Sequence, residues 1–228
     1  MDWNSKLASI FIGVALGDAL GAPHEFKNAG LIYTGKLEYE IKRITRFHQE
    51  IVHPIGSVTD DTQMTFALIR SLIWSGGYVP EDAVLSYESW AATSNMLGKN
   101  TRALFKGVKT YKGYESRYNK IFSAPMDSWT QSNGSLMRCT PFVIFPGYEE
   151  LSADCKLTNP HPINISCSII YSYILKNITI KGITPTISEL YAYANLEPVI
   201  KVLDDVKNKI IRKRLGLYCF VLRSVVSL

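Results

Sequence analysis

The run Thr59-Asp60-Asp61-Thr62 places two adjacent carboxylates at a predicted helix start. Neighbouring carboxylates repel each other, and a hard divalent cation such as Mg²⁺ relieves the repulsion because it prefers oxygen ligands. The hydroxyl of Thr59 would add a third oxygen. The alternative is that Thr59 is an N-cap and that both acids interact favourably with the helix macrodipole. On these four residues alone, that alternative needs fewer assumptions because it requires no metal.

Three further features carry residue types suited to chemistry. The run Ser132-Asn133-Gly134-Ser135-Leu136-Met137-Arg138 predicts a turn whose N–H groups suit a phosphate, although it lacks the Gly-Lys-Ser/Thr of a P-loop. In Asn159-Pro160-His161-Pro162, flanking prolines fix a histidine that could contact ligand hydroxyls. Glu25 is a candidate catalytic acid. Taken singly, each also fits an ordinary turn, an incidental loop histidine or an exposed glutamate.

Helices must position these residues, because apolar residues recur mostly at helical spacing. The first predicted helix, over 7–20, carries Gly13, Gly17 and Gly21 on one face, where a backbone or ligand could approach closely. A long surface loop is predicted over 28–54 and one β-rich run over 177–184. The pattern predicts an all-α single domain over residues 1–228. Its other helices are predicted over 59–74, 80–90, 101–109, 163–175, 188–194, 198–212 and from 215 onward.

Composition excludes several classes of protein. With 46% apolar and 20% charged residues among 228, the chain is neither disordered nor collagen-like. Its net charge of +5 is scattered, so no nucleic-acid groove is indicated. Four cysteines without a C-x-x-C pair favour reduced core thiols of an intracellular protein. Without a signal peptide or an apolar run of about 18 residues, we expect a cytoplasmic protein that does not span a membrane.

In their order along the chain, these features resemble the ADP-ribosylglycohydrolase family. The similarity begins with Gly13-x3-Gly17-Asp18-Ala19-Leu20-Gly21-x-Pro23-x-Glu25-Phe26 and continues through the three runs above. The family includes dinitrogenase-reductase-activating glycohydrolases and ADP-ribosyl-acceptor hydrolases. The resemblance implies a compact, orthogonal multi-helix bundle that hydrolyses the glycosidic bond between ADP-ribose and a modified protein side chain or related acceptor. The implied partners are an ADP-ribosylated protein or a free ADP-ribose conjugate.

The resemblance also implies a site with two Mg²⁺ ions, for which Mn²⁺ sometimes substitutes. The implied metal ligands are Thr59, Asp60 and Asp61. Glu25 or Asp61 would act as the catalytic carboxylate that takes a proton from water. The implied substrate-binding residues are Asn133, Gly134, Ser135 and Met137 around ADP-ribose and His161 beside the ribose or diphosphate.

Two departures from the family pattern define the alternative function. Many bacterial members carry Asp-x-Gly-Asn where this chain has Met96-Leu97-Gly98-Lys99. The Gly-Asp-x-Asp-Thr motif that completes the family's metal site does not occur in the 228 residues, and residues 215–228 resemble the helix that precedes it. We therefore expect about the N-terminal two thirds of the family fold, C-terminally truncated before the last helices, with an incomplete second metal site. The alternative is a catalytically degenerate relative that binds ADP-ribose or has a structural role.

Overall fold

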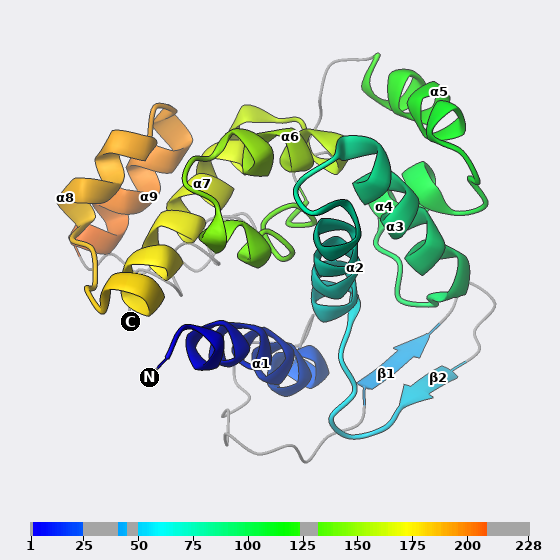
Figure 1. Cartoon of the computed structure of the whole chain (residues 1–228), viewed down its shortest axis with the longest axis horizontal. Helices are drawn as coiled ribbons and strands as arrows, with labels where there is room; N and C mark the ends of the chain where they lie inside the picture. The colour runs from blue at the N-terminus through cyan, green and yellow to red at the C-terminus, as the bar shows by residue number, and fades with distance from the viewer. Residues whose placement is uncertain (1, 25–40, 45–49, 124–131, 209–228) are drawn as a thin grey trace. The chain divides into compact units, whose positions relative to one another are not determined.

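The computed structural model describes residues 2–24, 41–44, 50–123 and 132–208, and these residues are mostly helical (Figure 1). They belong to two compact units, Met1–Gln63 and Met64–Leu228, which are treated separately below. The all-α prediction is confirmed, since strand structure in the described ranges is limited to one two-stranded sheet. The prediction of a single domain stays a prediction. Among the described helices, none combines the length and apolar character that a membrane-spanning helix needs.

The first unit begins with helix α1 (Trp3–Gly21), followed by a short 3-10 turn, η1 (Ala22–His24). Asp2 caps α1, since its Oδ1 accepts a hydrogen bond from the Ser5 N–H at 3.0 Å. The glycines of α1 were expected to admit a close neighbour. Apart from the backbone of α1 itself, no atom of the described residues lies within 4 Å of a Cβ placed at Gly13, Gly17 or Gly21.

An antiparallel hairpin lies inside the stretch predicted as a loop over 28–54. Strand β1 (Ile41–Ile44) pairs with β2 (Glu50–His53), so that Ile41 lies opposite His53 and Ile44 opposite Glu50. The loop prediction is wrong for these eight positions. Each strand carries two β-branched residues, which favour extended pairing, but they are too few for a clear alternating pattern.

The predicted helices around the Thr-Asp-Asp run are confirmed. Helix α2 (Asp60–Ser75) follows directly on Thr59, and α3 (Pro80–Thr93) begins with a proline whose missing N–H costs nothing there. Helix α4 (Lys99–Phe105) starts two residues earlier and ends four residues earlier than the predicted 101–109, and Gly98 is its N-cap residue. Local end signals therefore place these helices well, because caps and prolines act within one turn.

Two helices form in stretches where none is predicted from the sequence. Helix α5 (Tyr111–Phe122) is capped by Thr110, whose Oγ1 accepts from the Gly113 N–H at 3.1 Å. Its buried face is built from aromatic residues at spacings of three and four, a helical signal that the polar composition hides. Helix α6 (Glu149–Thr158) begins with two acids in its first turn, which the helix dipole favours.

The β-rich run over 177–184 does not form a strand. Helix α7 (Pro162–Lys176) instead continues into a π-helical turn, η4 (Asn177–Lys181), which ends at Gly182 with a φ of 69°. The Thr179 hydroxyl donates to the Leu175 carbonyl at 2.6 Å, and the Asn177 amide donates to the Tyr173 carbonyl at 2.7 Å. These bonds satisfy carbonyls of the preceding helical turn, so the helix overrides the strand preference of Ile178 and Ile180.

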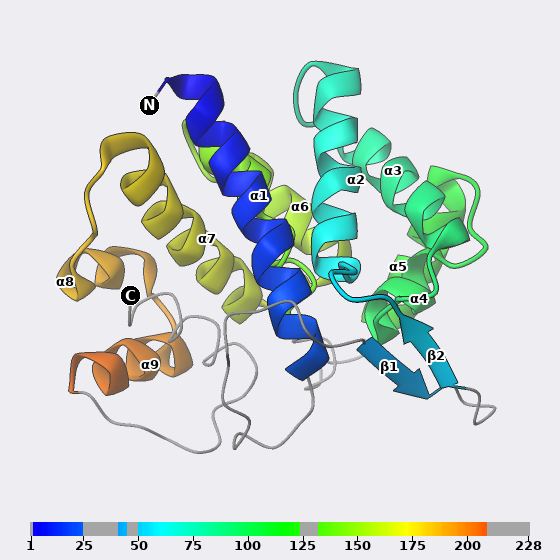
Figure 2. The same cartoon turned by 90° about the horizontal axis from the view of Figure 1, so that it is seen from below.

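The second unit contains two apolar cores. The first involves α2 to α6 and the 3-10 segment η3 (Thr140–Ile144), with Leu68, Phe105 and Phe142 among its fully buried members. The second lies where α7 packs with α8 (Ile187–Leu190), η5 (Tyr191–Tyr193) and α9 (Glu197–Lys207), as Figure 2 shows. The helix predicted from residue 215 onward lies outside the described residues.

Three of the four cysteines confirm the prediction of reduced core thiols. Cys139, Cys155 and Cys167 are buried and form no disulfide, whereas Cys219 lies outside the described residues. Burial raises the pKa of the Cys155 thiol to about 11 and raises that of Cys139 well above its ordinary value. Both thiols are therefore protonated at neutral pH.

We predict that these three cysteines resist alkylation in the native protein, because the thiolate is the reactive form and burial blocks access to it. Brief treatment with iodoacetamide at pH 7.5, followed by peptide mass spectrometry, should find Cys139, Cys155 and Cys167 unmodified. The same treatment in denaturant should label all three. Rapid native labelling of any one of them would contradict its burial.

Candidate functional site

In the first unit, one carboxylate holds the start of the Thr-Asp-Asp run. Asp18, in the last turn of α1, accepts four hydrogen bonds from residues 41 and 44 positions away. Thr59 donates its N–H at 2.7 Å and its hydroxyl at 2.8 Å. Thr62 donates its N–H at 3.2 Å and its hydroxyl at 2.6 Å. Asp18 thus supplies acceptors to the start of α2 from a distant part of the chain.

This arrangement gives α2 a charged cap in addition to a local one. The first N–H groups of a helix lack partners within it, and the helix dipole favours an anion at that end. The Thr59 oxygen also accepts from the Asp61 N–H at 3.4 Å, so the predicted N-cap position of Thr59 is confirmed. Asp18 was recognised only as part of a glycine-rich motif; its sequence neighbours give no sign that its partners are threonines of α2.

The start of α2 offers three oxygen-bearing side chains to a cation. Thr59 is buried, whereas Asp60 and Asp61 are partly exposed in the first turn. Because the Thr59 hydroxyl donates its proton to Asp18, a lone pair of its oxygen remains for a metal. In the described part of the chain, no group of three or more His, Cys, Asp and Glu side chains is placed to hold a metal. Thr59, Asp60 and Asp61 thus bring oxygen donors to one helix start, but they are fewer than the octahedral set that Mg²⁺ requires.

In the second unit, the 132–138 loop (Ser132 to Arg138) is held at its first residue by three asparagine amides. Asn159 and Asn164 donate to the Ser132 carbonyl at 2.9 and 3.2 Å. Asn100 donates to the Ser132 hydroxyl at 3.2 Å. A Cβ on Gly134 would lie 3.1 Å from Oδ1 of Asn159, so this position favours glycine. The loop thus packs directly against the predicted Asn159-Pro160-His161-Pro162 motif.

The loop closes into a single turn. The Met137 N–H donates to the Asn133 carbonyl at 3.0 Å, and the Met137 carbonyl accepts from the Thr65 hydroxyl of α2 at 3.3 Å. Of the predicted substrate-binding residues, Gly134 and Ser135 are buried, while Asn133 and Met137 are partly exposed. Substrate could therefore contact Asn133 and Met137, whereas Gly134 and Ser135 lie below the accessible surface.

Of the two remaining predicted site residues, His161 is described by the structure and Glu25 is not. His161 caps α7, since its Nδ1 accepts from the Ile163 N–H at 3.2 Å. Because Nδ1 accepts this bond, the donor N–H of the ring is at Nε2. Asn159, two residues earlier, contacts the 132–138 loop, so the two motifs predicted to bind substrate are neighbours. Glu25 lies outside the described residues.

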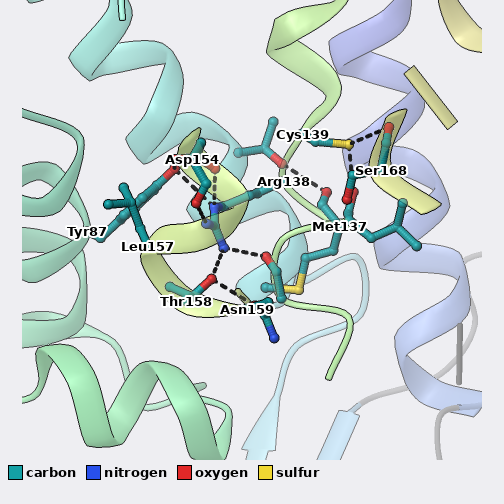
Figure 3. A network of polar contacts seen from close by, with 12 residues as sticks. Tyr87, Met137, Arg138, Cys139, Asp154, Leu157, Thr158, Asn159 and Ser168 are labelled. Atoms are coloured by element: carbon teal, nitrogen blue, oxygen red, sulfur yellow. Dashed lines mark hydrogen bonds and ion pairs between the residues drawn. The ribbon is translucent and has the colours of Figure 1, made fainter. Parts of the chain in front are cut away.

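Arg138 lies at the centre of a buried polar network (Figure 3). Its Nε donates to Oδ2 of Asp154 at 2.8 Å and to the Tyr87 hydroxyl at 3.0 Å. One terminal nitrogen donates to the Gly134 carbonyl and to the Thr158 hydroxyl, both at 2.7 Å, and the other to the Asp154 carbonyl at 2.8 Å. The guanidinium thus joins α3, α6 and the loop.

Electrostatics keep the guanidinium of Arg138 charged. Burial by itself would lower the pKa of Arg138, but the Asp154 carboxylate and the other polar neighbours raise it above its ordinary value. Burial, and then Asp154, raise the pKa of Tyr87, which donates to Oδ1 of that carboxylate at 2.7 Å. The guanidinium also lies 4.9 Å from the centre of the Tyr87 ring, within cation–π range. None of these partners of Arg138 was predicted from the sequence.

Comparisons with known proteins agree with this architecture. A solved structure described as an ADP-ribosylglycohydrolase-related protein complex superposes with a TM-score of 0.64 and 21% identity, covering 97% of this chain and 74% of that one. The fold is therefore of the ADP-ribosylglycohydrolase type. The family model for ADP-ribosylglycohydrolase matches residues 1–223, so the chain belongs to the ADP-ribosylglycohydrolase family. The resemblance stated from the motifs is thereby confirmed.

A curated relative is also similar in sequence. The ADP-ribosyl-[dinitrogen reductase] glycohydrolase of Rhodospirillum rubrum is 30% identical over 167 residues, which make up 71% of this chain and 53% of the relative. The chain spans about half the length of that relative.

We predict that Asp18→Asn lowers the free energy of unfolding by about 2 kcal/mol, because an amide replaces one acceptor oxygen and removes the charge from four hydrogen bonds. Asp2→Asn is the matched control: it changes an exposed aspartate at the other end of α1, and asparagine caps helices equally well. Urea unfolding followed by circular dichroism measures both. Equal losses in the two variants would show that the Asp18 bonds contribute little.

Proposed function

We propose that this chain hydrolyses the glycosidic bond between ADP-ribose and a modified protein side chain or related acceptor. Family membership and the name of the curated relative support this class of reaction. The observation that carries the proposal is the contact between the 132–138 loop and the Asn159 segment. It brings the two motifs implied to bind ADP-ribose into one place from 27 residues apart.

In the proposed nucleotide site, N–H dipoles would bind the ligand. The first N–H groups of the turn from Asn133 to Met137 have no acceptor within the turn, and that of the partly exposed Asn133 would suit a phosphate oxygen. His161 would donate from Nε2 to a ribose hydroxyl or a diphosphate oxygen, since its Nδ1 is already an acceptor. The side chains of Asn133 and Met137, which are partly exposed, would flank the bound ADP-ribose.

We further propose that Thr59, Asp60 and Asp61 hold Mg²⁺, with Mn²⁺ as a substitute. When bound, such a cation polarises oxygen atoms and lowers the pKa of water. Asp18 keeps the Thr59 oxygen oriented through its hydrogen bonds. Asp61 or Glu25 would take the proton from the attacking water as the acceptor leaves C1 of the ribose. The second ion typical of the family would need ligands beyond these three residues.

A second candidate function is binding of ADP-ribose without hydrolysis. The observation in its favour is the pair of side chains at Met96 and Lys99, where many bacterial members of the family carry a carboxylate and an amide. Met96 is buried at 2% exposure, and Lys99 is exposed in the first turn of α4. A thioether cannot accept a proton, so any acid–base role at position 96 is lost.

We predict that the purified chain releases free ADP-ribose from mono-ADP-ribosylated protein in the presence of Mg²⁺ or Mn²⁺, and that EDTA abolishes the release. Asp60→Ala combined with Asp61→Ala should reduce the rate at least about a hundredfold, because it removes both proposed carboxylate ligands of a metal that carries the chemistry. Chromatography of the released nucleotide measures the rate.

Glu149→Ala combined with Glu150→Ala is the matched control. It also removes two adjacent acids from the first turn of a helix, α6, and should leave the rate unchanged. Absence of release by the wild-type chain, together with binding of ADP-ribose in calorimetry, would contradict the hydrolase and support the binder. Equal loss in both double variants would mean that charge at helix starts, and not metal binding, sets the activity.

A further inference from the structure

We infer that Arg138 is a positioning residue for nucleotide binding: its buried guanidinium fixes the 132–138 loop in its binding conformation before ligand arrives. This inference rests on the proposed function of the loop. It differs from the simplest role for an arginine in a phosphate-binding motif, which is direct contact with the diphosphate.

Direct contact is excluded by burial and by the acceptors already present. Arg138 is 0% exposed, and each of its three nitrogens donates to at least one protein acceptor. The Asp154 carboxylate, 2.8 Å from Nε, neutralises its charge. A diphosphate would have to break this ion pair to reach the guanidinium. Arg138 can therefore influence a ligand only through the residues that it holds.

Two chains of hydrogen bonds lead from Arg138 to the loop. The direct one ends at the Gly134 carbonyl, 2.7 Å from a terminal nitrogen. In the indirect one, the same terminal nitrogen donates to the Thr158 hydroxyl, and that hydroxyl donates to Oδ1 of Asn159 at 2.7 Å. The Asn159 amide then donates to the carbonyl and the hydroxyl of Ser132. One guanidinium thus fixes the loop at its first and third residues.

A purely stabilising role does not account for this ion pair. Desolvating two charges costs several kcal/mol, and apolar residues of similar volume often give equal or greater stability. What an apolar pair cannot do is hold the Gly134 carbonyl at a defined angle. With that carbonyl held, the backbone of the 132–138 loop keeps its conformation, and a ligand does not have to order the loop on binding.

The test compares Arg138→Lys with Arg117→Lys in the full chain. Arg117 also donates to main-chain carbonyls, those of Ala103 and Lys106, but it lies between α4 and α5 and has no bond to the loop. Lysine keeps the charge beside Asp154 and loses the planar set of donors. Three quantities are measured: the free energy of unfolding, hydrogen–deuterium exchange of peptides covering 132–138 without ligand, and the Kd for ADP-ribose by calorimetry.

A second pair of variants, with smaller changes, keeps the test decisive if Arg138→Lys does not fold. Thr158→Val removes the hydroxyl that links the guanidinium to Asn159. Thr101→Val removes a buried hydroxyl of α4 that donates to the Gly98 carbonyl at 3.0 Å and, within the described residues, has no bond to the loop. Both change threonine to valine at buried positions within helices, so a general loss of stability should affect them alike.

We expect Arg138→Lys to speed exchange in 132–138 and to raise the Kd for ADP-ribose at least about tenfold, and Thr158→Val to do so about threefold. Arg117→Lys and Thr101→Val should change neither quantity, even where they lower the free energy of unfolding. Unchanged exchange and Kd in folded Arg138→Lys, or in Thr158→Val, would overturn the inference. If the wild-type chain binds no ADP-ribose, the proposed function fails, and the exchange data alone decide whether Arg138 positions the loop.

Discussion

The burial of one positive charge, that of Arg138, is a strong constraint on the second unit. A guanidinium removed from water must find acceptors for its N–H groups and an anion for its charge. Asp154 supplies the anion, and the further acceptors come from Tyr87, Thr158 and the Gly134 carbonyl. Because these groups belong to α3, α6 and the loop, satisfying Arg138 fixes all three together. The surrounding apolar residues then pack around one fixed arrangement of α3, α6 and the loop.

The first unit solves a similar problem with the opposite charge. The start of α2 has N–H groups and threonine hydroxyls that need acceptors, and the Asp18 carboxylate takes hydrogen bonds from four of them. In each unit, an ionised side chain thus holds a segment to which a ligand-binding role is assigned by family resemblance. The energetic reason is common to both, since bonds to charged groups are stronger than neutral ones and depend more on geometry.

Local signals explain which parts of this structure could be predicted. Helices α2, α3 and α7 start at a capped or proline position and carry apolar residues at helical spacing, so the sequence around them suffices. The hairpin was predicted as a loop because its strands are stabilised by pairing with each other. The π-helical turn was predicted as a strand because its conformation is set by the helix that precedes it. Likewise, the motifs at 59–62 and 132–138 are visible in the sequence. Their anchors, Asp18 and Asp154, are not, because contacts made 16 to 44 residues apart leave no periodic signal.

In the proposed site, the buried residues that hold the loop are not the residues that would contact ADP-ribose, and this difference affects how the ligand would be recognised. With the charge of Arg138 cancelled by Asp154, the proposed site would contact a diphosphate through dipoles, such as the partly exposed amide of Asn133 and a ring N–H of His161. Such dipoles are held by the fold, so they need little reorganisation when an anion binds. They also attract an anion less strongly at a distance than an exposed arginine would, which favours release of a charged product. On this argument, affinity in the proposed site depends on how rigidly the loop is held. That rigidity depends on the buried ion pair.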